Sequence, residues 1–425
     1  MPLPNRANLI RHQLGNGLKV VVEPDPSLPL VALNIQYHVG SKNERPGRTG
    51  LAHLFEHMLF QGSQHVDTNG HFAHIQAAGG VANGNTTRDL TTYYETLPSQ
   101  HFELGLWLES DRMGFLLPAL TAEKLETQRQ VVMNERRLRV DNQPYGVATE
   151  RIFELLYPLP HPYHWPIIGT LEDIAGATLD EVRGFFSTYY RPANAVLSLV
   201  GDLEPEAALA AVERYFGELD GEGRSVPAVA RELPPLPEER RQVLEDEVAL
   251  SRVYQAYRIP SCTSPGWHAY DLLAYALGIG KSSPLYRELV QESQLLQQVA
   301  VYAYSSELQG VLMLSANLHQ GVELAAAEAA LVEQLERVAQ DGPAPADFER
   351  ARNRVATELY LDLERQDSRA NYYSTLTSLF DDPGRLTTEV DRYLEVSLAE
   401  VRQAAADVLS QGCITVGVVP RGEAE

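Results

Sequence analysis

The residues with the clearest chemical potential lie in one short segment, Gly50 to Phe60, which contains the pattern His-x-x-Glu-His. On a helix, His53 and His57 are one turn apart on one face, and Glu56 points in the same direction. Two imidazoles with this spacing can share one zinc ion, and the neighbouring carboxylate can act as a general base. The segment therefore predicts a helix that binds zinc and serves hydrolytic chemistry.

The residues around this pattern distinguish a metal site from a chance occurrence. The chain has 12 histidines in 425 residues, so a five-residue motif such as His-x-x-Glu-His can also arise by accident. Five of the large apolar side chains in the segment can bury the helix: Leu51, Leu54, Phe55, Met58 and Leu59. Two histidines and a glutamate in a buried helix are costly without a charge-balancing partner, and a metal ion supplies one.

Length and composition restrict the class of protein. At 425 residues we expect two or more domains, and 44% hydrophobic with 22% charged residues is typical of a globular protein. A net charge of −22 argues against a nucleic-acid partner. The two distant cysteines, Cys262 and Cys413, favour reduced thiols. No apolar leader or membrane span is visible, which predicts a cytoplasmic protein without a membrane partner and leaves open a mature periplasmic form.

Elements along the chain divide it into two halves. Strands are expected at 18–22 and 31–38, and Thr49 is a candidate N-cap for the motif helix. We expect two paired strands within 81–97 and a long helix over 122–140. The segment 220–242 is rich in Pro, Gly and charge and is interpreted as a linker.

The second half repeats the pattern that ends the first. Thr178-Leu-Asp-Glu-Val-Arg and a following strand mirror Ser397-Leu-Ala-Glu-Val-Arg and its following strand. This match predicts duplication of an α+β module. The expected fold is therefore α+β, with two homologous modules, each a mostly antiparallel sheet packed with helices. The boundaries are residues 1–219 for the zinc-bearing module, 220–242 for the linker and 243–425 for a diverged module without a metal site.

The inverted motif, the repeat and a downstream glutamate together resemble the pitrilysin/insulinase/mitochondrial processing peptidase family of inverzincin metallopeptidases, in particular its bacterial, zinc-bearing, β-like subunits. The resemblance covers nearly the whole chain and implies one Zn²⁺ per chain. It also implies that Glu135, in Val131–Arg137, is the third ligand. The residues alone leave four other candidates open: Glu109, Glu123, Glu126 and Glu150.

A second stretch resembles the edge strand that receives peptide substrate in this family. Asn83, Gly84, Asn85 and Thr86 match its Asn-Ala-x-Thr pattern, with Gly84 in place of Ala. The resemblance implies that peptides bind here as an added strand, through their backbone. The alternative is an ordinary strand whose edge is covered.

The sequence departs from the family at three further positions. Gln128 stands where relatives carry a glutamate seven residues before the third ligand; an amide can hydrogen-bond there but cannot balance charge. Val290 and Gln297 occupy the positions of an Arg and a Tyr that contact the peptide in single-chain relatives. The resemblance then implies a heterodimer in which a paralogous subunit supplies Arg and Tyr.

The function expected from this resemblance is a zinc-dependent endopeptidase, with Glu56 as catalytic base, that cleaves short or unfolded peptides. The alternatives are a non-catalytic core subunit of a complex and a self-sufficient homodimeric peptidase. Two further patterns are set aside. Gly278–Ser283 lacks the first glycine of a P-loop, and His71-x-x-His74 is interpreted as a solvated helix face.

Overall fold

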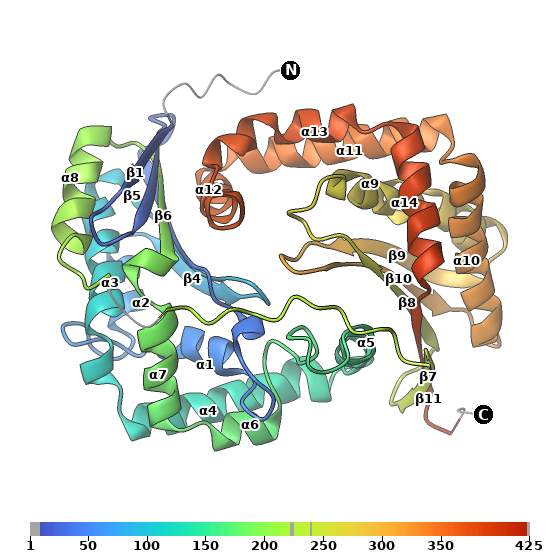
Figure 1. The fold of residues 1–425 in the computed structure, drawn as a ribbon, viewed down its shortest axis with the longest axis horizontal. Helices are drawn as coiled ribbons and strands as arrows, with labels where there is room; N and C mark the ends of the chain where they lie inside the picture. Colours follow the sequence, from blue (N-terminus) through green and yellow to red (C-terminus); the bar gives the residue numbers. More distant parts are fainter. Residues whose placement is uncertain (1–8, 222–224, 239, 423–425) are drawn as a thin grey trace. The chain divides into compact units, whose positions relative to one another are not determined.

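The structure, a computed structural model, describes residues 9–221, 225–238 and 240–422 (Figure 1). Part of the predicted linker, residues 222–224 and 239, therefore lies outside the described residues. So do the first eight residues, on which the predicted lack of a leader depends in part.

The chain forms two compact units that are not continuous in sequence. Unit 1 combines the ranges 1–136, 165–229 and 360–387, and unit 2 combines 137–164, 230–359 and 388–425. Each unit thus contains a segment from the other half of the chain. The modules predicted from the sequence, residues 1–219 and 243–425, differ from these compact units, and their boundaries stay a proposal.

Unit 1 is built on a six-stranded sheet with the order β1-β2-β6-β3-β5-β4. Its strands are β1 (Ile10–Gln13), β2 (Lys19–Pro24), β3 (Leu30–Tyr37), β4 (Val81–Thr86), β5 (Thr91–Pro98) and β6 (Ala195–Gly201). β2 and β6 are parallel, and all other neighbours are antiparallel. β3 and β6 are buried almost throughout, as expected for strands covered on both faces.

Unit 2 is built on a five-stranded sheet with the order β7-β11-β8-β10-β9. Its strands are β7 (Arg241–Asp246), β8 (Arg252–Ile259), β9 (Leu296–Tyr304), β10 (Gly310–Leu318) and β11 (Ile414–Pro420). β7 and β11 are parallel, and the other pairs are antiparallel. This order and sense are the same as those of β2-β6-β3-β5-β4. The predicted α+β fold of two similar, mostly antiparallel modules is confirmed.

Helices cover both sheets. Those of unit 1 are α1 (Leu51–Met58), α2 (Gly70–Ala77), α3 (Phe102–Phe115), α4 (Ala122–Arg136), α6 (Leu171–Gly176), α7 (Leu179–Tyr189), α8 (Pro205–Phe216) and α12 (Gln366–Phe380). Those of unit 2 are α5 (Ala148–Leu156), α9 (Trp267–Gly278), α10 (Leu324–Asp341), α13 (Glu389–Glu395) and α14 (Leu398–Gln411), and α11 (Pro345–Glu364) runs from unit 2 into unit 1. The predicted helix over 122–140 ends at Arg136 and continues as a π-helical turn, Arg137–Asp141.

The repeated sequence pattern has the same local structure in both places. Thr178 and Glu181 form a capping box at the start of α7, and Ser397 and Glu400 form one at the start of α14. In each box the hydroxyl accepts from the backbone of the glutamate, whose carboxylate accepts from the cap residue. A sheet strand follows each helix, β6 in one case and β11 in the other.

Helix α12 comes from late in the sequence but packs on the sheet of unit 1. Its buried residues join a cluster with Val21, Ala32, Val196 and Val200 of that sheet. Arg369 of α12 is buried, and its Nε lies 3.1 Å from a carboxylate oxygen of Glu23 on β2. In Figure 1, α12 lies on one side of this sheet, and α1, α3 and α8 lie on the other. Of the predicted metal ligands, His53 and His57 lie on α1 and Glu135 lies on α4.

Candidate metal centre

Helix α1 turns one face into the core of unit 1. Leu54, Phe55 and Met58 are at most 1% exposed, whereas His53, Glu56 and His57 on the other face are half-buried. The ring of Phe55 lies 4.4 Å from that of Tyr190, between centroids, which fixes the rotation of the helix. The predicted ligands therefore point together, away from the core.

The start of α1 is held by Glu44 and not, as predicted, by Thr49. The N-cap is Gly50, with φ of 82°, a left-handed conformation that favours glycine. The backbone N–H groups of Gly50 and Ala52 donate to the Glu44 carboxylate at 2.9 and 2.7 Å. The Thr49 hydroxyl instead donates to Asp173 at 2.6 Å. Because a carboxylate six residues upstream can reach the free amide groups of the first turn, the local pattern around Thr49 was misleading.

Helix α4 brings Glu135 to the two histidines. Its Oε2 lies 3.2 Å from Nε2 of His57 and 3.9 Å from Nε2 of His53. One ligand atom from each of the three residues falls within 4.8 Å of the other two. Among the described residues, this is the group formed around the motif, and none of the other four candidate glutamates belongs to it.

These three residues fit a zinc ion. Ligand atoms at 2.0–2.1 Å from a tetrahedral zinc lie about 3.3 Å from one another. Glu135 lies at 3.2 Å from His57, close to this value, and at 3.9 Å from His53, somewhat farther, and two histidines with one glutamate are a donor set of catalytic zinc sites. A small inward adjustment of the side chains would complete the triangle.

The fourth residue of the motif contacts the predicted substrate strand. The hydroxyl of Thr86, at the end of β4, donates to Oε2 of Glu56 at 2.6 Å. β4 is an edge strand that alternates between exposed residues (Val81, Asn83, Asn85) and half-buried ones (Ala82, Gly84, Thr86). Gly84 allows close packing, since a Cβ there would lie 3.0 Å from the Tyr93 ring and 3.3 Å from the Phe60 ring.

Both halves of this chain are similar to known proteins. The family model described as "Insulinase (Peptidase family M16)" matches residues 19–159, and the one described as "Peptidase M16 inactive domain" matches residues 176–355. The "Zinc protease PqqE" of Helicobacter pylori is 29% identical over 92% of this chain and 88% of its own length.

Solved structures agree. A crystal structure of a protease from Helicobacter pylori superposes with a TM-score of 0.90 at 27% identity, covering 97% of this chain and 100% of that one. The chain belongs to the insulinase (M16) peptidase family.

Another relative by fold is twice as long. The periplasmic protease PqqL from Escherichia coli has a TM-score of 0.75 at 19% identity, and the match covers 99% of this chain but 48% of PqqL. This chain therefore corresponds in fold to about half of PqqL. Among the described residues, no helix of this family member combines the length and apolar character needed to cross a membrane.

The three departures from the insulinase family have clear places in the structure. Gln128 is buried on α4, about two turns before Glu135 and on the same side of the helix. Val290 lies in a π-helical segment, Tyr286–Glu292, and is half-buried. Gln297 is exposed at the start of β9.

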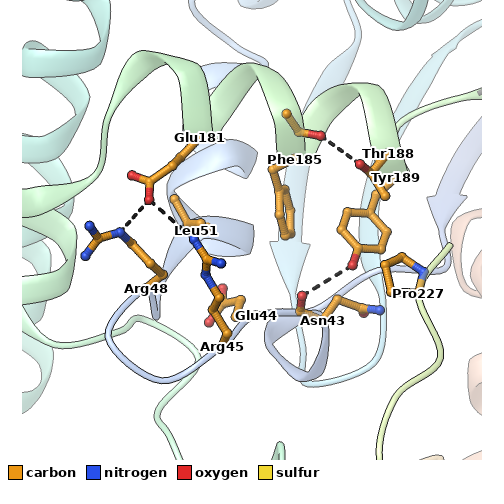
Figure 2. A pocket seen from close by; sticks show the side chains of 11 residues that line it. Asn43, Glu44, Arg45, Arg48, Leu51, Glu181, Phe185, Thr188, Tyr189 and Pro227 are labelled. Carbon is orange, nitrogen blue, oxygen red and sulfur yellow. Dashed lines mark hydrogen bonds and ion pairs between the residues drawn. The ribbon is translucent and has the colours of Figure 1, made fainter. Parts of the chain in front are cut away.

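A pocket of about 320 Å³ lies beside the first turn of α1 (Figure 2). It is lined by Asn43, Glu44, Arg45, Arg48, Leu51, Glu181, Gly184, Phe185, Thr188, Tyr189 and Pro227. Arg48 lies 2.5 Å and Arg45 3.8 Å from the same oxygen of Glu181, and the Tyr189 hydroxyl donates to the Asn43 carbonyl. None of the residues around the predicted zinc site lines this pocket.

A second cluster of ionisable residues lies inside unit 1, behind β4. His71, Glu95 and Glu109 are at most 3% exposed, and Nε2 of His71 lies 2.5 Å from Oε1 of Glu95. The interpretation of His71 as part of a solvated helix face was therefore wrong, although His74 is exposed. No local signal reveals this, because the partners of His71 come from β5 and α3.

The cation of this cluster is Arg112. Its Nε donates to Glu109 at 2.7 Å, its Nη2 donates to the other oxygen, and its guanidinium lies 4.1 Å from the Tyr93 ring centre. Burial raises the pKa of Glu95 and of Glu109 to about 7, and Arg112 opposes that shift. Burial also lowers the pKa of His71 to about 3, so His71 is neutral near pH 7. Arg112 already supplies the positive charge that a metal would bring.

We predict that this cluster makes the stability of the zinc-free protein pH-dependent. Unfolded glutamates titrate near about 4.3. The two folded glutamates keep protons up to about pH 7, so their stabilising contribution is complete below about pH 4 and decreases as the pH rises towards 7. The lowered pKa of His71 has the opposite effect on stability and offsets part of this decrease. Denaturant unfolding between about pH 5 and about pH 7.5 should show a shallower decrease for Glu95→Gln than for the wild type.

The matched control is Glu103→Gln on α3, since Glu103 is half-exposed against Arg214. This variant should keep the wild-type slope. Equal slopes for Glu95→Gln and the wild type would contradict the prediction.

Proposed function

We propose that this chain is a zinc-dependent endopeptidase that cleaves short or unfolded peptides. The observation that carries the proposal is the convergence of His53, His57 and Glu135 within 4.8 Å, with Glu56 on the same face of α1. A three-residue donor set leaves a coordination position open, which suits catalysis more than structural binding. We propose one zinc ion per chain, held by these three residues.

The chemistry divides between the metal and Glu56. Zinc, when bound, would supply a Lewis acid that polarises a carbonyl group and lowers the pKa of water. A carboxylate oxygen of Glu56 accepts the proton of the attacking water and then donates it to the leaving amine. Gln128 would hydrogen-bond near the third ligand without adding charge.

Peptide binding is proposed at β4. This strand pairs with β5 on one side and forms the edge of the sheet on the other. An extended peptide could add to the backbone of Asn83, Gly84 and Asn85 as a further strand. Such recognition depends on the peptide backbone, which favours unfolded substrates over folded proteins.

We further propose that the chain works with a paralogous subunit. Val290 and Gln297 cannot provide the charged or phenolic hydrogen bonds expected opposite the metal. Support also comes from PqqL, of which this chain matches about half. The alternatives are a self-sufficient homodimeric peptidase and a non-catalytic core subunit. We also propose that the chain is cytoplasmic, or periplasmic after processing.

The replacement Glu56→Gln tests the role of the base. It removes the proton acceptor but leaves all three ligands, so zinc content should stay near the wild-type value while peptide cleavage falls by about 10²-fold or more. The measurements are metal analysis and hydrolysis of a quenched fluorescent peptide.

Glu135→Gln is the matched control, because it changes a carboxylate to an amide at the ligand. It should lose zinc as well as activity. A Glu56→Gln protein with full peptidase activity would refute the proposed function.

Mixing experiments test the pairing. The purified chain should cleave the quenched peptide only after addition of a paralogous subunit that lacks His-x-x-Glu-His and carries the Arg and Tyr. Size-exclusion chromatography with light scattering should then show a complex of the two chains. Full activity of this chain alone, at a rate that the second subunit does not change, would favour the homodimer instead.

A further inference from the structure

We infer that Thr86 is a positioning residue that holds the Glu56 carboxylate in place for proton transfer. The inference rests on the proposed peptidase function and concerns the same site. It changes the role expected for Thr86, which the sequence grouped with the substrate-binding residues Asn83, Gly84 and Asn85. Its side chain donates a hydrogen bond to the catalytic base Glu56. The peptide contacts are assigned to the outward-facing residues of β4.

The direct observation is the hydrogen bond from Thr86 Oγ1 to Glu56 Oε2, at 2.6 Å. This length is typical of a hydroxyl that donates to an ionised carboxylate, a bond about twice as strong as a neutral one. The last torsion of a glutamate has a broad energy profile. A hydrogen bond to one oxygen therefore selects one orientation of the carboxylate.

The backbone of β4 determines which residues face α1. Thr86 and Gly84 share one side of the strand, and Asn83 and Asn85 share the other. Because Gly84 has no side chain, the strand lies directly against Phe60, just after the end of α1. A larger residue at position 84 would push the strand outward and carry the Thr86 hydroxyl away from Glu56.

The turn that follows Thr86 is held rigidly. Thr86 pairs with Thr91 at the end of the β4–β5 ladder. The Thr87 hydroxyl accepts from the backbone N–H groups of Asp89 and Leu90, at 3.1 and 3.0 Å, and the Thr87 N–H donates to the Leu90 carbonyl. These bonds hold the turn in one conformation, and the N–H groups of Ser41 and Lys42 tie it to the segment before α1 by donating to the Thr87 and Arg88 carbonyls at 3.2 and 3.0 Å.

Two buried tyrosines, Tyr93 and Tyr190, interact electrostatically with Glu56. Tyr93 and Tyr190 are at most 2% exposed, and burial raises the pKa of both hydroxyls. The negative charge of Glu56 adds to both shifts. Thr86 thus donates to a carboxylate whose charge also acts on two buried tyrosines.

The test compares Thr86→Val, which keeps the shape but removes the hydroxyl, with Thr86→Ser, which keeps the hydroxyl. In the presence of the paralogous subunit, Thr86→Val should lower kcat by about 10- to 100-fold and change KM by less than about 2-fold. Thr86→Ser should stay within about 3-fold of wild-type kcat. Thr86→Ala should show the same loss as the valine variant, and it serves as the measured variant if valine prevents folding.

Two readouts do not depend on turnover. Zinc content, by metal analysis, should equal that of the wild type in all three variants. The dissociation constant of a fluorescent peptide from zinc-free protein, by anisotropy, should also be unchanged. Thr92→Val is the control. The Thr92 hydroxyl accepts a hydrogen bond from Gln36, and Gln36 also donates to α12, which covers the face of the sheet opposite to α1. This control should keep wild-type kcat.

The outcomes separate this inference from the proposed function. An unchanged kcat in Thr86→Val would overturn the inference, and so would a weaker peptide affinity at unchanged kcat, which would make Thr86 a substrate contact. If Glu56→Gln remains fully active, the peptidase proposal itself fails. If Glu56→Gln is inactive and Thr86→Val is fully active, only the role of Thr86 is wrong.

Discussion

Helix α1 has eight residues, and an isolated helix of that length is unstable in water. The geometry of His53 and His57 therefore depends on what holds this helix. Phe55 packs between aromatic rings of the core, and Glu44 binds the free amide groups of the first turn. With one face and one end secured, the polar face has a defined direction, and the other parts of the site are built around it.

Three elements from distant parts of the sequence meet at that face. α1 supplies two imidazoles and a carboxylate, α4 supplies Glu135, and β4 supplies the hydroxyl of Thr86. Each is supported by its own contacts, so the site does not depend on a single loop. Arg112, buried and bound to Glu109, also lies over the ring of Tyr93 on the neighbouring strand β5, which supports the same region. A polar site over a rigid support suits preorganised catalysis.

Local patterns in the sequence were sufficient where the physics is local. The His-x-x-Glu-His helix and the helix that begins each of the two repeated segments are set by residues within a few positions of each other. The choice of Glu135 needed the family resemblance, because a ligand from a distant helix leaves no mark of spacing. The Glu44 cap, the buried state of His71 and the packing of α12 on the first sheet were not found. For His71 and α12 the deciding partners are brought near only by the tertiary fold, whereas Glu44 lies close in sequence but six residues before the N-cap, outside the usual capping positions.

The central claim is that His53, His57 and Glu135 hold one zinc ion. The most direct measurement is a crystal structure of the zinc-loaded protein with anomalous diffraction data collected on both sides of the zinc absorption edge. The account predicts one anomalous peak per chain, at about 2.0–2.2 Å from an Nε2 atom of each histidine and from a carboxylate oxygen of Glu135. A protein that takes up zinc with no peak between these three residues, or with the peak at another group of ligands, would contradict it.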